Sequence, residues 1–277
     1  MTQILQSYGV RETTDVVSTT DSIVEEIRIV GYAVMEGVLS DSDLEFIREK
    51  IDEIYETQVN EIGGLPYLAE INDVNMVRLL LAYDDLFLTV ATNARVLEVV
   101  EKLLGDYFIL GQQNAIINPP DLGNYQSSWH RDLSYQHFVS SRPLAVSALF
   151  CIDDFSPETG GTHVLSGSHK FEPFPSEQFV KKYEHCVSAK AGSVLIFDAM
   201  LYHRAGANTS KLNRRALNHL YTLPFLKQQI SISQALHGRF SEDPFLRRFL
   251  GYDSEPGKNV TDWRMAKIER SRKLSQE

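Results

Sequence analysis

The N-terminal third of the chain places apolar side chains with the period of a helix. They recur every three or four residues, so each predicted helix has one apolar face. The first and last of these segments end at Gly31 and Gly105, and glycine is the residue at which many helices terminate. The predicted helices cover 22–30, a stretch that begins near 40–42 and continues past Ile54, and 94–104.

After Gly105 the pattern changes. Short runs rich in β-branched and aromatic residues follow one another, separated by Gly, Pro, Asn and Asp. This is typical of strands in a sandwich or barrel rather than of a parallel α/β sheet. The predicted strands cover 32–35, 107–117, 144–152, 162–165, 193–197 and 215–223, and two later helices cover 240–250 and 262–273.

These elements predict a mainly β protein with flanking helices. A length of 277 residues would allow two domains, but β-rich single domains often reach this size. We expect a single domain over 1–277, in which 19–105 gives helical support, 106–224 forms the β core and 225–277 adds helices and loops. The irregular stretch 58–80 and the segment after 225 are expected to form walls or lids of a pocket.

Composition and charge narrow the classes of function. The 27 basic and 37 acidic residues give a net charge of −10, which argues against nucleic acid or an anionic membrane as a partner. The cysteines, Cys151 and Cys186, form neither a CxxC site nor a disulfide framework. We see no apolar signal region and no run near the ~20 apolar residues of a membrane span. The sequence therefore predicts a cytoplasmic, soluble protein.

Three separated side chains have the chemistry of a metal site. His130 and Asp132 are two residues apart, so on an extended segment both point to the same side. His203 follows a predicted strand far downstream. Two histidines and one carboxylate form the ligand set of non-haem Fe(II) sites that activate O₂. Histidine and aspartate also bind Zn²⁺, so a zinc hydrolase or isomerase without redox chemistry is the alternative.

A cation follows the distal histidine. Arg214 lies eleven residues after His203 and opens the last predicted strand. A guanidinium there can hold a carboxylate through two hydrogen bonds. Arg214 and Arg215 face opposite sides of the strand, so only one of them can point inward. Such a carboxylate clamp has no role in the zinc alternative.

Ordered motifs in the chain resemble the phytanoyl-CoA dioxygenase family of Fe(II)/2-oxoglutarate oxygenases. The similarity spans about residues 20–225. It is carried by Gly31-Tyr32, Trp129-His130-Arg131-Asp132, the glycine-rich block GGTHVLSGSH at 160–169, and Gly192-Ser193 with Asp198, His203, Arg214 and Tyr221 behind it.

The resemblance implies a double-stranded β-helix core, a jelly roll of the cupin type, over 106–224. It implies Fe(II), 2-oxoglutarate and O₂ as cofactors, with His130, Asp132 and His203 as the iron ligands. Arg214 has the family's spacing for the residue that holds the far carboxylate of 2-oxoglutarate. Some family members have a serine where this chain has Ala205, which leaves one auxiliary contact in doubt.

The sequence also predicts contacts to the co-substrate and to the substrate. The strand before the metal motif usually adds a co-substrate contact, and Gln112 and Asn114 are the polar candidates of the right parity. Substrate candidates are Tyr135, Gln136 and His137, on the loop after the metal motif, and Arg78, for which an ion pair is the default interpretation.

The sequence thus favours an oxygenase that hydroxylates a small-molecule metabolite and releases succinate and CO₂. Related halogenases replace the metal carboxylate by a small residue, so Asp132 favours hydroxylation. A sensor that has kept the fold without catalysis is a third hypothesis, which the complete ligand set disfavours. The sequence specifies neither the substrate nor the oligomeric state.

Overall fold

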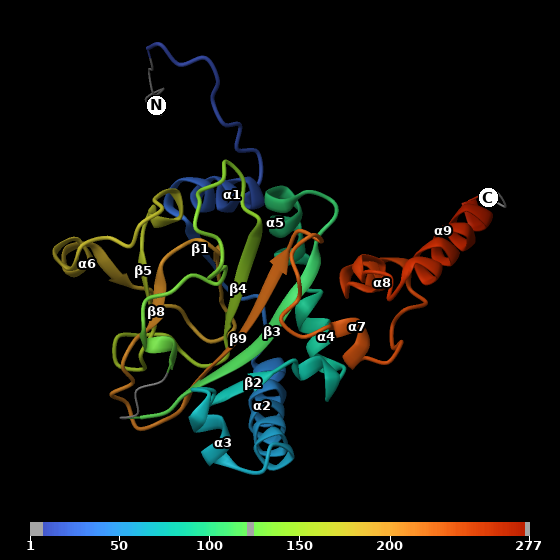
Figure 1. The fold of residues 1–277 in the computed structure, drawn as a ribbon. Coiled ribbons are helices and arrows are strands. Elements are labelled where there is room, and N and C mark those ends of the chain that lie inside the picture. Colours follow the sequence, from blue (N-terminus) through green and yellow to red (C-terminus); the bar gives the residue numbers. More distant parts are fainter. Residues whose placement is uncertain (1–7, 121–124, 275–277) are drawn as a thin grey trace.

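Two antiparallel β-sheets lie at the centre of the molecule, and helices surround the larger one (Figure 1). The computed structural model describes residues 8–120 and 125–274. The larger sheet has the strand order β1-β7-β4-β9-β3-β2, and the smaller has the order β6-β5-β8. The strands are β1 Tyr32–Met35, β2 Met76–Arg78, β3 Ile109–Asn118, β4 Ala145–Cys151, β5 Thr162–Leu165, β6 Glu184–Cys186, β7 Val194–Asp198, β8 His203–Ala205 and β9 Arg214–Thr222.

Helices precede the sheets, follow them and connect some of their strands. Short 3₁₀ turns lie at Leu80–Ala82, Tyr125–Ser127, Ser168–Lys170 and Tyr252–Ser254. The α-helices are α1 Thr19–Val30, α2 Asp41–Glu61, α3 Leu65–Glu70, α4 Leu86–Ala91, α5 Ala94–Leu104, α6 Glu177–Tyr183, α7 Ile232–Ala235, α8 Pro244–Phe249 and α9 Val260–Leu274. In Figure 1, α9 projects away from the sheets.

The two-residue period of the strands separates two apolar clusters. On β4, Val146, Ala148 and Phe150 join the large cluster formed with the helices, because they share one face of the strand. Leu149 and Cys151 point the other way, into the smaller cluster. We call the face of the large sheet that carries Leu149 and Cys151 its inward face. This face is lined partly by apolar side chains.

The observed elements correct the expected fold in part. The structure mixes helices with antiparallel sheets, so "mainly β" holds only roughly. The first helix begins at Thr19 rather than 22, because Ser18 Oγ accepts a hydrogen bond from the amide of Asp21 at 3.1 Å and caps it. Its predicted end at Gly31 is confirmed. Within the part of the chain that the structure describes, we find no helix long and apolar enough to cross a membrane.

Candidate active site

The structure brings together the three side chains of the predicted metal site. One ligand atom from each of His130, Asp132 and His203 can be chosen so that all lie within 4.8 Å of one another. Asp132 Oδ1 lies 3.5 Å from His203 Nε2 and 3.9 Å from His130 Nε2. These three atoms form one compact N, N, O donor set.

Backbone pairing explains why the two histidines meet. The amide of each donates to the carbonyl of the other, at 3.0 and 3.1 Å, so His130 and His203 lie opposite each other across an isolated antiparallel bridge. Opposite residues of such a pair project to the same face, and the ring centroids are 4.3 Å apart. Asp132 is two residues farther on, and its amide donates to Ala199 O at 3.0 Å.

Carbonyl groups orient both imidazole rings. His130 Nδ1 lies 2.8 Å from Ser128 O, and His203 Nδ1 lies 2.9 Å from Leu201 O. A carbonyl oxygen only accepts, so each Nδ1 must carry the proton and donate it. In the neutral ring each Nε2 then has the lone pair that binds a metal, and a metal ion would replace any proton that Nε2 carries.

Asp132 is held through one of its two oxygens. Ser147 Oγ on β4 and Asn218 Nδ2 on β9, the latter at 3.3 Å, both donate to Asp132 Oδ2. Oδ1 is thereby left directed at the two Nε2 atoms. Ser147 and Asn218 are not among the residues predicted from the sequence. A signal was present for Ser147, which is the one polar hydroxyl residue of the otherwise apolar strand β4, whereas Asn218 lies on a strand with several polar residues.

The electrostatics give a ligand set that is ready for a cation. Burial opposes ionisation of Asp132, but the charge and hydrogen bonding of His203 outweigh it and lower the pKa of the carboxyl. Burial, together with His203, lowers the pKa of His130 to about 4. Burial would lower the pKa of His203 too, but the Asp132 carboxylate beside it raises that pKa.

We expect Ser147→Ala to weaken metal binding by roughly 10- to 100-fold, the usual cost of removing a partner that orients a ligand. The carboxylate would lose one of its two donors and rotate more freely. Titration of the apoprotein with Fe(II) or Co(II) measures this affinity. Ser193→Ala, at another buried serine just before β7, is the matched control and should leave it unchanged. Equal affinities in the two variants would contradict the orienting role.

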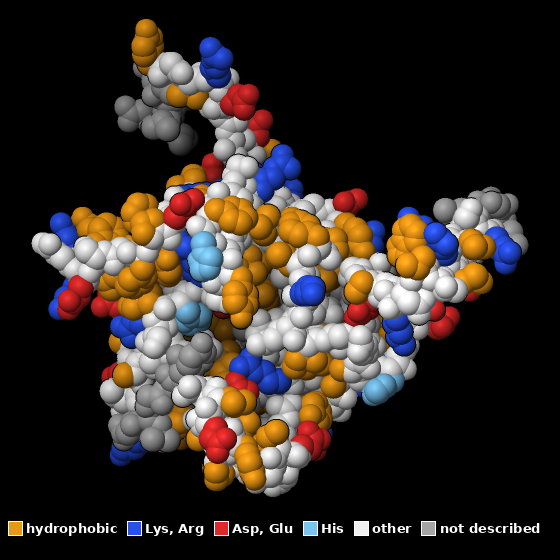
Figure 2. Space-filling view, in the orientation of Figure 1, with side chains coloured by type: hydrophobic (Ala, Val, Ile, Leu, Met, Phe, Trp, Pro, Cys, Tyr) orange, Lys and Arg blue, Asp and Glu red, His pale blue; other side chains and the backbone are white. Residues whose placement is uncertain are grey.

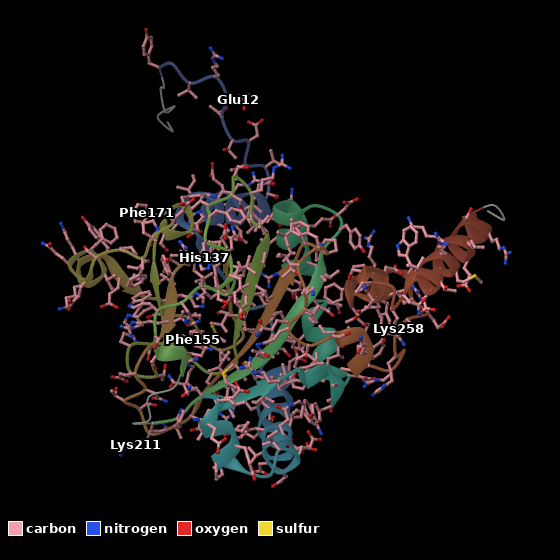
Figure 3. All side chains as sticks on the ribbon, in the orientation of Figure 1. Glu12, His137, Phe155, Phe171, Lys211 and Lys258 are labelled. Atoms are coloured by element: carbon pink, nitrogen blue, oxygen red, sulfur yellow. The ribbon has the colours of Figure 1, made fainter. Side chains whose placement is uncertain are left out.

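Arg214 lies in the same cavity as the three candidate ligands. The cavity is also lined by Ile116, Gln126 and Thr162. The guanidinium is buried, donates from Nη2 to Gly160 O at 2.7 Å, and lies 4.6 Å from the centre of the Phe155 ring, which Figure 3 labels.

No carboxylate neutralises this cation among the residues that the structure describes. Nε of Arg214 is buried and has no hydrogen-bond partner there. Burial lowers the pKa of Arg214 to about 10, so the group stays charged at neutral pH. Arg215 points to the opposite side of β9, where it pairs with Asp52 at 2.6 Å and Asp153 at 3.2 Å.

The structure does not bring Gln112 or Asn114 to Arg214. Their parity along β3 is the expected one, but Asn118 is the residue directly opposite Arg214 in the antiparallel register. The β3 residue that lines the Arg214 cavity is Ile116. Gln112 and Asn114 lie farther along the strand, beside a separate small cavity, and Gln112 also lines the cavity of about 610 Å³ that Asp132 lines. A co-substrate contact of these two residues stays a prediction.

Two larger cavities open beside the candidate ligands. One of about 510 Å³ touches His130 and is also lined by Gln136 and His137. Another of about 610 Å³ touches Asp132 and is also lined by Tyr135 and Gln136. Figure 2 shows a hollow near the middle of the molecule, bordered by histidine and basic side chains.

Arg78 has the ion pair that was its default interpretation. Its guanidinium binds Asp73, with Nε 3.1 Å from Asp73 Oδ2. The backbone of Arg78 is held by the side-chain amide of Gln58, which accepts from Arg78 N at 2.9 Å and donates to Arg78 O at 2.6 Å. Arg78 does not line either of the two larger cavities.

The candidate ligand set and the two sheets are features of a known family of enzymes. The chain belongs to the phytanoyl-CoA dioxygenase family, because the family model "Phytanoyl-CoA dioxygenase (PhyH)" matches residues 27–216. The resemblance found in the sequence is thereby confirmed.

The chain is also similar to a relative over most of its length and to solved structures of the same fold. The chain is 34% identical over 226 residues to uncharacterized protein Rv1501 of Mycobacterium tuberculosis, covering 79% of this chain and 81% of the relative. EctD from S. alaskensis, crystallised with 2-oxoglutarate and 5-hydroxyectoine, has a TM-score of 0.62 at 20% identity, covering 78% and 79% of the two chains. HygX from Streptomyces hygroscopicus, with nickel and 2-oxoglutarate bound, has a TM-score of 0.57 at 21% identity, covering 76% and 90%. At these identities the two structures support the fold.

Proposed function

We propose that this protein is an Fe(II)/2-oxoglutarate-dependent oxygenase that hydroxylates a small-molecule metabolite. The observation that carries the proposal is the pairing of two features in one cavity. A 2-His-1-carboxylate donor set lies beside Arg214, a buried cation without an acidic partner in the described residues. A zinc hydrolase or isomerase would use the donor set but would leave Arg214 without a role.

We infer that the two sheets form the double-stranded β-helix of one domain. The bridge at His130 adds a fourth segment to the small sheet, giving the order His130, β8, β5, β6. After β3 the chain passes to His130, back to β4, on to β5 and β6, back to β7, on to β8 and back to β9. This alternation between facing sheets is that of a jelly roll. It places the metal ligands on the inner side of the small sheet.

The donor set fits Fe(II). His130 and His203 would each supply Nε2, and Asp132 would supply Oδ1, while their other polar atoms are held by the protein. Three protein ligands leave positions for a co-substrate and O₂. When bound, iron and 2-oxoglutarate would supply the oxidation, in which one atom of O₂ enters succinate, CO₂ leaves, and the other atom replaces a substrate C–H bond by C–OH.

Arg214 fits the far carboxylate of 2-oxoglutarate. Its Nε is buried and unpartnered, and the cavity around it reaches the candidate ligands. The free volume of this cavity is about 40 Å³, less than 2-oxoglutarate occupies. Half-buried side chains at its edge, Gln126 and Arg204, would therefore move when the keto acid binds.

Apolar residues would keep bulk water from the same space. Leu149, Phe197 and Ala216 line the cavity between the sheets. The Phe197 ring lies with its centroid 4.7 Å from that of His203. Excluding water strengthens the attraction between Arg214 and a bound carboxylate, because the local dielectric constant is low.

The direct test is turnover of 2-oxoglutarate by the purified protein. We expect slow release of succinate without added substrate when the apoprotein is loaded with Fe(II) in the presence of O₂. A chelator should abolish the release, and Zn²⁺ should not restore it. Succinate and oxygen consumption are measured together. A protein that retains iron yet neither binds nor consumes 2-oxoglutarate would rule the proposal out.

A further inference from the structure

The cavity of about 610 Å³ is a candidate substrate site, given the proposed function on which this inference rests. Its volume lies within the range typical of small-molecule sites. It touches the metal-site carboxylate Asp132. Apolar surface predominates in its wall, to which Leu133, Phe138, Leu144, Leu220, Phe225 and Leu226 contribute beside four glutamines and other polar residues. A largely apolar ligand body fits such a wall.

The cavity extends along β9 away from the metal site. Arg214, at one end of the strand, and Asn218, which binds Asp132, face the cavity between the sheets. Leu220 and Thr222 continue the same face of the strand and line the larger cavity. Thr222 is the fourth residue after Asn218, a span of roughly 13 Å in a strand. An elongated ligand can therefore reach from the metal site to the far end.

A well-anchored segment closes that far end. Residues 225–229 line the cavity after β9. Gln228 holds this segment in place, because its Nε2 donates to Leu110 O at 2.8 Å and its Oε1 accepts from Ile232 N at 3.0 Å. Leu110 lies at a register shift of β3, next to Gly111. Lys227, beside Gln228, thus comes from a segment with a defined position.

Lys227 is a cation without a counter-charge. It is exposed, so its ammonium group lies at the rim. Apart from Asp132, it is the only charged side chain among the described residues that line the cavity. Some basic groups on the surface have acidic partners, such as Lys190 with Asp154 at 2.7 Å. Lys227 has no ion pair within 8–120 and 125–274, although the protein as a whole is acidic.

Two residues that line the same cavity each have a buried polar atom without a partner. Thr222 is 3% exposed and Gln136 is 8% exposed, and both line the cavity. Thr222 Oγ1 and Gln136 Oε1 have no hydrogen-bond partner in the part of the chain that is described. Gln136 Nε2 donates to Phe138 O at 2.8 Å, which fixes Oε1 as the free acceptor. Both atoms are shielded from the cavity by their neighbours, so they require no polar group along the length of the ligand.

We propose that the substrate is an elongated, mainly apolar molecule with one anionic group, and that Lys227 binds this group at the rim of the cavity. Carboxylate and phosphate share the required chemistry. Because the rim and the metal site lie at opposite ends of the cavity, the oxidised carbon is remote from the anionic group. The new hydroxyl oxygen comes from O₂, as in the proposed function.

The test compares four probes of equal chain length on the iron-loaded protein: dodecanoate, dodecyl phosphate, dodecanamide and dodecylamine. We expect at least one anion to bind tenfold more tightly than the amide and the amine, by calorimetry, and to stimulate succinate release. Lys227→Gln should bring anion and amide affinities within about twofold. The matched control is Lys211→Gln, at an exposed lysine that Figure 3 shows far from the hollow of Figure 2, and it should keep the preference.

Three results would overturn the proposal: equal binding of anion and amide by the natural protein, an anion preference that survives Lys227→Gln, or a product hydroxylated next to the anionic group. Succinate release without any probe reports on the proposed function separately. If that release occurs but no anion is preferred, the substrate proposal fails and the oxygenase remains. If it never occurs, the oxygenase proposal fails, and calorimetry still decides the charge preference.

Discussion

Asp132→Ala is expected to remove bound iron and, with it, all measurable turnover of 2-oxoglutarate. Asp132 supplies the only anionic ligand atom of the candidate set, Oδ1, between the two Nε2 atoms. Loss of a partner that merely orients a ligand costs 10- to 100-fold in metal affinity, so loss of the ligand itself should cost roughly 100-fold or more. Iron retained after dialysis is measured by elemental analysis, and activity by succinate release.

Two further variants separate iron loss from misfolding. Asp132→Asn keeps the shape of the side chain but removes the charge, and it should also lose iron. Asp154→Ala removes a carboxylate that pairs with Lys190 on the surface, and it should retain iron and turnover. Thermal unfolding of all three shows whether the fold persists. Full iron occupancy in Asp132→Ala, with the fold intact, would exclude the proposed ligand set.

The candidate metal ligands were predictable from the sequence because their signal is local or ordered. His130 and Asp132 lie two apart on an extended segment, and alternation alone places them on one side. The approach of His203 was not local, since it depends on an antiparallel bridge between segments more than 70 residues apart. The family resemblance supplied that link, and no periodicity could have done so.

Ser147 and Asn218 escaped prediction for a related reason. Each lies on a strand that is buried on both faces. In such a strand the sequence does not alternate between apolar and polar residues, so it does not show which face a polar side chain lies on. Their meaning appears only when β4 and β9 are neighbours in the larger sheet and face Asp132. Polar residues at inward positions of such strands are the signal to look for.

Gln112 and Asn114 show what the parity of a strand leaves open. Their parity was read correctly, but parity does not specify how far along a strand a residue lies from its target. The register of β3 against β9 sets that distance, and it shifts once between Leu110 and Gln112. Turns and tertiary contacts determine register, so a single strand pattern does not reveal it.

The structure of the segment 58–80 could not be predicted from the pattern of apolar residues either. It contains α3 and β2, followed by Leu79 with φ 44°, a conformation that a bulky residue rarely adopts. The side chain of Gln58 pairs with the backbone of Arg78, as a neighbouring strand would. Contacts from distant residues impose this structure, whereas helices such as α5 follow from their own apolar face.

Arg214→Ala is expected to raise the KM for 2-oxoglutarate about 100-fold while iron remains bound. Truncating one partner of a buried charge pair costs about 2–5 kcal/mol, and 2.7 kcal/mol corresponds to 100-fold. Arg214 stays protonated at neutral pH, because burial lowers its pKa only to about 10. The guanidinium has no other carboxylate to bind among the described residues. Removing it should therefore weaken the binding of 2-oxoglutarate rather than the stability of the fold.

The neighbouring arginine is the matched control for this result. Arg215→Ala removes ion pairs with Asp52 and Asp153 on the opposite face of β9, so it should lower thermal stability and leave the KM for 2-oxoglutarate nearly unchanged. Steady-state succinate release over a range of 2-oxoglutarate concentrations measures both variants. If Arg215→Ala raises the KM and Arg214→Ala does not, the co-substrate binds on the other side of the strand. The buried, unpaired charge of Arg214 would then have to bind an anion other than 2-oxoglutarate.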